Sequence, residues 1–409
     1  MASVLFIADM EEGHLLPTFG LGKKILNRGH SLVYAGIADN EEFVKGHGFD
    51  FVPVLQQKYP KGYRSKARLE QLTSGVSPEF HLVDIMINDE FDDIYCRLTP
   101  DVVIVSTSLS LEALLIYYKY DVQPIIFTHY LFAQGGPRQE AYLRLTNHSM
   151  RDLFGLFRFL ETLEPKIVSS AGLARFMEPL DHFTEFVACP RQFELPGVTF
   201  RSATHHIGPC IRNEDGKWEQ GEFLLEIGKT KKIIFASMGS QSNRYYDSCS
   251  TLFGNLITLM SQDDMRNFHL VLSTGFTYEY TGHRPSNVTL LKWAPQLEVL
   301  KLADVAIIHG GLGSVKECIY YGVPMIVFPQ AHDQPSNAKR VEHHQLGIIG
   351  NLETITAEEL KSHIHYLVSD ASVQESVLKM KTLFHQEEQS AGALELIEEK
   401  AFKKAESLQ

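Results

Sequence analysis

Short apolar runs separated by helical patterns recur in two series along this chain, and this rhythm most constrains its fold. The first series comprises Val4–Ala8, Ser31–Gly36, Phe51–Leu55, Val102–Val105 and Ile125–Phe127. The second series comprises Lys232–Ser237, Phe268–Ser273, Val288–Leu291, Val305–Ile308 and Met325–Phe328. Continuous apolar strands that alternate with helices are buried on both faces, so each series predicts a parallel β-sheet covered by helices.

The sequence therefore predicts an α/β protein with two Rossmann-like βα domains that face each other across a cleft, which suits 409 residues. The expected parts are an N-terminal domain at 1–207, a linker at 208–228, a C-terminal domain at 229–385 and a final helix at 386–409. The charged helical patterns from residue 356 onward are expected to close the second domain. Because open parallel sheets bind ligands at the carboxyl ends of their strands, the cleft is the expected site.

An aromatic stretch, RDLFGLFRFLETL at 151–163, interrupts the first series. A helix packed on the core is the simpler interpretation, and a wall of an apolar pocket is the alternative.

The paired histidines at 205–206 and 343–344 are expected to be solvated.

Composition narrows the possible partners. The 50 acidic residues outnumber the 38 lysines and arginines, which disfavours nucleic acid and anionic membranes as partners. The five cysteines form no Cys-x-x-Cys pair and are expected to be buried thiols in a reducing cytosol. No apolar run approaches about 18 residues, so we expect no integral membrane segment and a cytoplasmic location.

Residues 307–334, IIHGGLGSVKECIYYGVPMIVFPQAHDQ, place a Gly-rich turn between an apolar run and a helical pattern. Glycines let the backbone approach a ligand closely, and the free N–H groups at a helix start attract an anion. His309 and Ser314 can add side-chain donors. The turn matches neither a Walker loop nor a Gly-x-Gly-x-x-Gly dinucleotide fingerprint. It outlines a diphosphate cradle, and mere tight packing is the plain alternative.

Neighbouring residues favour the cradle. The indole of Trp293 could stack on a nucleobase, and the amide of Gln296 could hydrogen-bond a ribose. Glu317 lies four residues after Gly313 on the same helix face and could accept hydrogen bonds from two ribose hydroxyls. Farther along, residues 333 and 334 follow the next apolar run and could bind sugar hydroxyls. A nucleotide, a diphosphate and a sugar each have a candidate contact.

The segments WAPQLEVL, HGGLGSVKE, YGVPMIVFPQ and DQPSNA stand in the order that is usual in one family. With them, the chain resembles the nucleotide-sugar-dependent glycosyltransferases of the two-Rossmann-domain, or GT-B, type, close to the natural-product and macrolide enzymes. FASMGS and GHLLP add weaker similarity. Leu312-Gly313 stands where plant members carry Trp-Asn, and the stretch from Trp293 to His309 is shorter than in plants, which indicates a bacterial branch.

This resemblance implies roles for individual residues. Trp293 would stack on uracil or thymine, and Gln296 and Glu317 would hold the ribose. The remaining implied donor contacts are His309, Gly311, Gly313 and Ser314 for the diphosphate with Ser240 nearby, and Asp333 and Gln334 for the sugar.

His14 is the candidate catalytic base. It follows the first predicted strand in the segment GHLLP, and an imidazole titrates near working pH and can take a proton from an acceptor hydroxyl. Family members usually orient this histidine with an aspartate after a later strand, and the matching position here is Ser106. Loss of such a carboxylate from a Ser-His-Asp triad costs about 10⁴ in rate. Either Asp9, Glu11 or Glu12 replaces it, or the acceptor is unusually acidic.

The chain contains no Asp-x-Asp sequence; the nearest resemblance is Glu90-Phe-Asp92. Metal-dependent transferases commonly hold Mg²⁺ or Mn²⁺ on the diphosphate with such acid pairs. The sequence thus predicts no metal and no cofactor beyond the sugar nucleotide. The helix start, His309 and Ser314 would stabilise the departing charge instead.

We therefore expect an inverting transferase that moves a hexose, with glucose as first choice, from a UDP- or dTDP-sugar to a small apolar natural product such as a polyketide or macrolide. The first domain would bind this hydroxylated acceptor, through residues 59–85 and 130–200, and the second the donor. Two alternatives stay open. One is a nucleotide-sugar epimerase, and the other, suggested by Ser106, is a non-catalytic protein that binds nucleotide sugars. A dehydrogenase is disfavoured by the glycine pattern of DMEEGHLLP.

Overall fold

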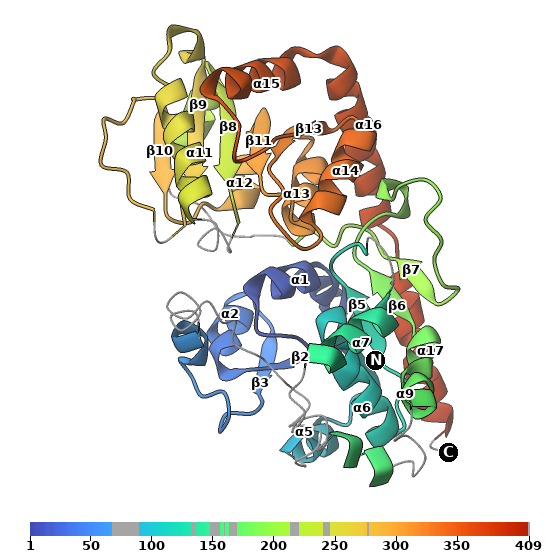
Figure 1. Cartoon of the computed structure of the whole chain (residues 1–409). Coiled ribbons are helices and arrows are strands. Elements are labelled where there is room, and N and C mark those ends of the chain that lie inside the picture. Colours follow the sequence, from blue (N-terminus) through green and yellow to red (C-terminus); the bar gives the residue numbers. More distant parts are fainter. Residues whose placement is uncertain are drawn as a thin grey trace. The chain divides into compact units, whose positions relative to one another are not determined.

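The chain forms two compact units, each built on a parallel sheet (Figure 1). This computed structural model describes residues 1–67, 90–132, 136–147, 156–158, 160–162, 170–212, 221–239, 246–275 and 278–407. Unit 1 comprises Met1–Cys189, Thr199–Arg212 and Ser390–Gln409, and unit 2 comprises Pro190–Val198 and Asn213–Gln389. Two α/β units with parallel sheets confirm the predicted fold class.

The sheet of unit 1 has the strand order β3-β2-β1-β4-β5-β6-β7, with parallel pairing between neighbours. Its strands are β1 (Ser3–Ile7), β2 (Ser31–Gly36), β3 (Asp50–Pro53), β4 (Val102–Ser106), β5 (Ile125–Thr128), β6 (Glu185–Val187) and β7 (Thr204–His206). The order reverses beside β1, because β1 pairs with β4 as well as with β2. Such a reversal opens a crevice between the loops that leave the two strands.

Side chains of β1 alternate between two apolar clusters. Leu5 and Ile7 belong to one cluster, and Val4 and Phe6 belong to the other, so the sheet is buried on both faces. The helices of this unit are α1 (Glu12–Asn27), α2 (Glu41–Gly46), α5 (Glu90–Leu98), α6 (Ser110–Tyr120), α7 (Pro137–Asn147), α9 (Ser170–Met177) and α17 (Gly392–Ser407). Leu156 and Leu160 of the aromatic stretch are buried in the first cluster, which favours the core interpretation, and much of the rest of that stretch lies outside the described residues.

The C-terminal helix α17 belongs to unit 1 (Figure 1). Ala393 and Ile397 are buried in the same cluster as Phe19 of α1. Glu398 accepts hydrogen bonds from Arg28 at 2.9 Å and lies 3.2 Å from a ring nitrogen of His30. This differs from the expectation that all helices after residue 356 close the second domain, because the apolar face of α17 is buried in the first.

The sheet of unit 2 has the order β10-β9-β8-β11-β12-β13, again with parallel neighbours and a reversal beside its first strand. Its strands are β8 (Lys232–Ser237), β9 (Phe268–Ser273), β10 (Val288–Leu291), β11 (Val305–Ile308), β12 (Met325–Val327) and β13 (Gly347–Ile349). Its helices are α10 (Gly221–Gly228), α11 (Tyr246–Leu259), α12 (Gln296–Leu300), α13 (Leu312–Tyr321), α14 (Gln334–His343), α15 (Ala357–Ser369) and α16 (Ala371–Glu388). Thus α10 occupies the end of the stretch that was expected to be a linker, and residues 213–220 of that stretch lie outside the described residues.

A segment from the first half of the chain, Pro190–Val198, is part of unit 2. Glu194 forms a buried ion pair with Arg340 of α14, with 2.6 Å between Oε1 and Nε. Phe193 stacks on His344, whose Nε2 lies 3.1 Å from the Phe193 carbonyl oxygen. Separating a buried ion pair would leave a charge buried without its partner and would strongly destabilise the protein. The pair therefore fixes this segment to α14.

Three sequence expectations about single residues are wrong. Cys96 on α5 is exposed, whereas the other four cysteines are buried. His206 and His344 are half-buried and bonded to the carbonyl groups of Cys189 and Phe193, so neither is a solvated surface residue.

Within the described part of the chain, no helix has the length and apolar character needed to cross a membrane.

Replacing Ile397 with Ala tests the assignment of α17 to unit 1. Ile397 is fully buried, so we expect Ile397→Ala to lower the free energy of unfolding by about 2–5 kcal/mol. The matched control is Phe402→Ala on the same helix, where the side chain is 65% exposed and the expected change is within about 0.5 kcal/mol. Urea denaturation followed by circular dichroism measures both. Equal effects of the two substitutions would contradict this packing.

Candidate functional site

The first group of candidate residues lies where the loops that leave β1 and β4 diverge. Ile7 of β1 pairs with Val105 of β4, so the carboxyl ends of the two strands are adjacent. Asp9 follows β1, Ser106 ends β4, and Ser108 lies in the next turn. The reversal of strand order therefore brings these polar side chains together from distant parts of the sequence.

His14, in the first turns of α1, is held by Asp9. The Nδ1 atom of His14 lies 2.5 Å from Oδ2 of Asp9, and the His14 side chain is 40% exposed whereas that of Asp9 is 9% exposed. The backbone N–H of Glu11 donates to Oδ1 of Asp9 at 3.0 Å. The amide of Asn40 donates to the carbonyl oxygen of Asp9 at 2.9 Å. Both carboxylate oxygens and the backbone of Asp9 are thus held in place.

The charge state of Asp9 fixes the tautomer of His14. Burial raises the pKa of Asp9, but the charge and hydrogen bond of His14, the charge of His129 and the Ser108 hydroxyl outweigh burial and hold that pKa below its usual range. An ionised carboxylate can only accept, so Nδ1 of His14 carries the proton. Nε2 is then the basic nitrogen of the ring.

Ser106 does not orient His14, contrary to its assignment from the family pattern. Its hydroxyl lies 3.0 Å from Oγ of Ser108 and 3.4 Å from Nδ1 of His129. Asp9, one of the acids that were considered as replacements, reaches the imidazole. The physical reason is proximity along the chain, since Asp9 lies in the loop that leads directly into α1. The sequence analysis missed Ser108 and His129, which follow the carboxyl ends of β4 and β5.

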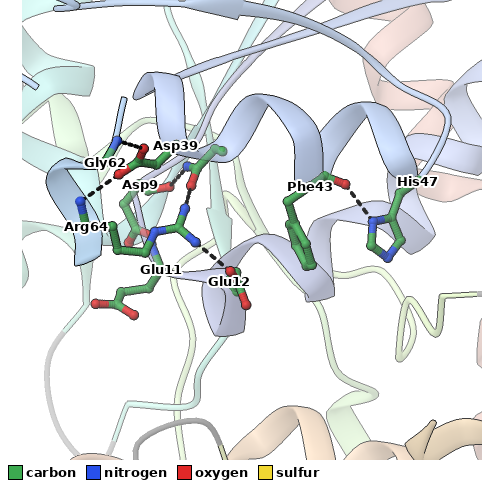
Figure 2. Close-up of polar contacts among 9 residues, drawn as sticks. Asp9, Glu11, Glu12, Asp39, Phe43, His47, Gly62 and Arg64 are labelled. Carbon is green, nitrogen blue, oxygen red and sulfur yellow. Dashed lines mark hydrogen bonds and ion pairs between the residues drawn. The ribbon is translucent and has the colours of Figure 1, made fainter. Parts of the chain in front are cut away.

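Glu12 is engaged elsewhere, as Figure 2 shows. Its carboxylate accepts a hydrogen bond from Arg64 at 2.5 Å, and Arg64 also donates to the side chain of Asn40. The backbone N–H groups of Gly62 and Arg64 donate to Asp39 at 2.5 and 2.6 Å. Arg64, which is 8% exposed, therefore holds the segment after β3 against Glu12 at the start of α1 and against Asn40, whose amide bonds the Asp9 carbonyl oxygen. Most of 59–85, the first stretch expected to shape the acceptor pocket, lies outside the described residues.

The second group of candidate residues lies at the corresponding position of unit 2, where β8 and β11 end side by side. Ile308 of β11 pairs with Ser237 of β8, and His309 and Gly239 follow these strands. A Cβ added to Gly239 would lie 2.5 Å from the His309 ring, and one added to Gly311 would lie 2.6 Å from it. Gly239 also has a φ of +75°, which favours glycine. The ring of His309 requires a glycine on either side.

His309 is a neutral donor in this setting. Burial lowers its pKa to about 4, and its Nδ1 is buried without a partner among the described residues. The ring is therefore uncharged at neutral pH and can donate one N–H.

The start of α13 offers further donors. Gly311 precedes the helix without a side-chain cap, and the first helical N–H that finds a carbonyl is that of Val315, which bonds Gly311 at 3.1 Å. Within the described residues, the N–H groups of Leu312, Gly313 and Ser314 have no acceptor. A Cβ added to Gly313 would meet nothing within 4 Å, so there is open space beside these donors. Free N–H groups and a positive helix end are suited to bind an anion.

Three of the predicted donor contacts meet around the first turn of α13. The Nε2 group of Gln296 donates to Oγ of Ser314 at 3.2 Å and to a carboxylate oxygen of Glu317. Glu317 is 6% exposed, whereas Trp293, in the turn after β10, is 54% exposed. A buried carboxylate thus lies beside the first turn of α13, and an exposed indole precedes α12 in the chain. Ser240 lies outside the described residues.

Asp333 is joined to the glycine turn through Asn337, and Gln334 is held by the loop before it. The amide of Asn337 donates to Oδ2 of Asp333 at 2.8 Å and to the carbonyl oxygen of Gly310 at 2.9 Å. The side-chain oxygen of Gln334 accepts from the backbone N–H groups of Gln330 and Ala331, which leaves its NH₂ group to donate. The sequence analysis missed Asn337, although its position one helical turn after Asp333 was a usable signal.

Comparisons with known proteins agree with this fold. A family profile described as UDP-glucoronosyl and UDP-glucosyl transferase matches residues 253–391. The chain is 26% identical to the NDP-glycosyltransferase YjiC of Bacillus subtilis (strain 168), over 93% of this chain and 92% of that protein. It is 32% identical to the oleandomycin glycosyltransferase of Streptomyces antibioticus, over 47% of this chain and 43% of that protein. Two solved structures share the fold. The glycotransferase of kitacinnamycin has a TM-score of 0.71 and 23% identity, with 98% of both chains covered. The glycosyltransferase VinC in complex with dTDP has a TM-score of 0.67 and 16% identity, with 98% of this chain and 99% of VinC covered.

These matches confirm the resemblance to the nucleotide-sugar-dependent glycosyltransferases of the UDP-glycosyltransferase and macrolide type. The chain is a glycosyltransferase of the nucleotide-sugar-dependent, natural-product type, and its two α/β units are those of the GT-B fold. The family match spans all the donor candidates of unit 2 from Trp293 to Gln334. Among the described residues of this glycosyltransferase, no three His, Cys, Asp or Glu side chains are grouped so that they could hold a metal ion.

Replacing Gly313 with Ala tests the predicted diphosphate position. Because the added methyl meets no protein atom within 4 Å, the glycosyltransferase should stay folded and gain up to about 1 kcal/mol of helix stability. The methyl would occupy the space beside the free N–H groups, so we expect UDP binding to weaken at least tenfold by calorimetry. The matched control is Gly254→Ala in α11, another helical glycine with open space, which should leave UDP binding unchanged. Equal affinity of both variants would place the phosphates elsewhere.

Proposed function

We propose that this glycosyltransferase transfers a hexose, with inversion, from a UDP- or dTDP-sugar to a hydroxyl group of a small apolar natural product. The observation that carries the proposal is the Asp9–His14 pair, which presents Nε2 of His14 as a base at the carboxyl edge of the first sheet. In the reaction, Nε2 takes the acceptor's hydroxyl proton while the oxygen attacks the anomeric carbon. A carbon–oxygen bond forms, the bond to the diphosphate breaks, and its electron pair leaves with the diphosphate. A single displacement inverts the anomeric carbon.

The departing diphosphate would be stabilised by groups of unit 2. The free N–H groups at the start of α13, the neutral His309 and the hydroxyl of Ser314 are preorganised donors. Fixed donors directed at developing charge are among the largest contributions to catalysis. This donor set supports a metal-independent reaction.

Glu317 favours a UDP-sugar as the first donor to test. Ribose offers this buried carboxylate two hydroxyl donors, and deoxyribose offers one. Asp333 and the NH₂ group of Gln334 similarly suit a sugar rich in hydroxyl groups, which supports glucose. The relatives named for oleandomycin and kitacinnamycin support a natural-product acceptor, and the VinC complex keeps dTDP-sugars in the donor panel.

The non-catalytic alternative rested on a serine at the position of the usual aspartate. Asp9 removes that reason, because it supplies His14 with a carboxylate from another loop. The epimerase alternative is addressed by incubating the donor alone, since an epimerase changes the sugar without an acceptor.

His14→Ala tests the proposal. The variant should lose about 10²–10⁴ of the transfer rate, because no group takes the acceptor proton, while UDP binding measured by calorimetry stays unchanged. The assay is a panel of UDP- and dTDP-hexoses against hydroxylated natural products, read by mass spectrometry for an added hexose. His182→Ala serves as control, since His182 is an exposed histidine of the same unit. Full transfer by His14→Ala, or an epimerised sugar from the donor alone, would refute the assignment.

Metal independence is tested by chelation. Because the proposed donors around the diphosphate belong to the protein, we expect the initial rate to be the same with and without EDTA after extensive dialysis. A loss of rate that Mg²⁺ or Mn²⁺ restores would show that a cation stabilises the leaving group.

A further inference from the structure

A chain of hydroxyl groups continues from Asp9 away from His14. The hydroxyl of Ser108 donates to Oδ2 of Asp9, the same oxygen that lies 2.5 Å from His14. Oγ of Ser106 lies 3.0 Å from Oγ of Ser108, and Nδ1 of His129 lies 3.4 Å from Oγ of Ser106. His129 is 5% exposed, and its ring centroid is 4.3 Å from that of His14. Two histidines are therefore connected to one carboxylate, one directly and one through two serines.

The number of protons fixes the direction of this chain. Since an ionised Asp9 only accepts, Ser108 uses its one proton to donate to it. Ser108 must then accept from Ser106, and Ser106 must accept from the Nδ1–H of His129. Every donor points toward Asp9.

We propose that Ser108, supported by Ser106 and His129, is a positioning residue that sets the basicity of His14 by sharing the negative charge of Asp9. The proposal rests on the proposed role of His14 as the base. A hydrogen bond to the charged form of a carboxylate stabilises that form. The hydrogen bond from Ser108 partly neutralises the charge on Oδ2. The attraction between Oδ2 and a protonated His14 is therefore weaker. Ser108 thereby lowers the pKa of His14, so that His14 stays unprotonated and available as a base down to a lower pH.

Other titratable groups lie near this oxygen. His129, at the end of β5, is the second titratable ring beside His14. Glu12 is paired with Arg64, and Glu11 contacts Asp9 through its backbone N–H, which does not titrate near neutral pH. Ser108 is thus a non-titrating side chain that shares Oδ2 with His14, so its removal changes the base without removing a charge.

Ser108→Ala is the primary test, and the readout is the pH profile of kcat/KM, whose acidic limb reports the base of the free enzyme. Without this donor, Asp9 stabilises protonated His14 more strongly. The acidic limb should therefore move to higher pH by about half a unit to one unit, while KM for the sugar nucleotide stays unchanged. Ser108→Thr, which keeps the hydroxyl, should restore the wild-type limb. Ser110→Ala removes a nearby buried hydroxyl that has no partner among the described residues and should cause no shift.

Ser106→Ala gives a second measurement if Ser108→Ala is unstable. It breaks the chain one step farther from Asp9, so the acidic limb should move in the same direction by a smaller amount. The inference is overturned if wild type transfers hexose, His14→Ala does not, and both serine variants keep the wild-type limb. Failure of the proposed function is read separately, from absent transfer by wild type or undiminished transfer by His14→Ala.

Discussion

The buried carboxylate of Asp9 is the interaction on which the candidate residues of unit 1 depend. An ionised carboxylate removed from water is destabilised by several kcal/mol unless charge and hydrogen bonds compensate. Here His14, the Ser108 hydroxyl and the Glu11 N–H supply that compensation. Because the buried carboxylate needs these partners, the loop after β1 is held in one conformation. The same contacts define which nitrogen of His14 is basic. The conformation of the loop and the tautomer of His14 therefore have one physical cause.

The geometry of the sheet explains how this carboxylate can come from the loop after β1. Because β1 and β4 are neighbours, the residues that follow them lie at one crevice, and Ser108 and Asp9 touch across it. A carboxylate from either loop can therefore reach an imidazole at the start of α1. In this chain the carboxylate follows β1, and the hydroxyl groups lie at the end of β4 and in the turn after it. The carboxylate beside this histidine, which the family resemblance implies, thus comes from a different position in the sequence.

Much of the fold was predictable, since β8, β9, β10 and β11 are continuous apolar runs whose bounds the sequence gives correctly. The short strands β6, β7 and β13 were missed because EFV, THH and GII are too short to show a period. The position of α17 was missed because amphipathic periodicity shows that a face is buried but not against which core. Asp9 was one of several acids in one loop, and only coordinates distinguish the carboxylate that faces His14 from Glu12, which faces Arg64.

The two groups of candidate residues, one in each unit, differ in how they are built, and this difference decides how each can vary. The donor group of unit 2 uses backbone N–H groups and glycines around His309, where any added Cβ at Gly239 or Gly311 collides with the ring. Such an arrangement is specified by the backbone path, so its sequence pattern is rigid and easily detected. The group around His14 in unit 1 uses side chains that meet across a crevice, and equivalent contacts can be made from more than one loop. Sequence patterns therefore predict the donor group residue by residue, whereas the group around His14 must be recognised by its geometry.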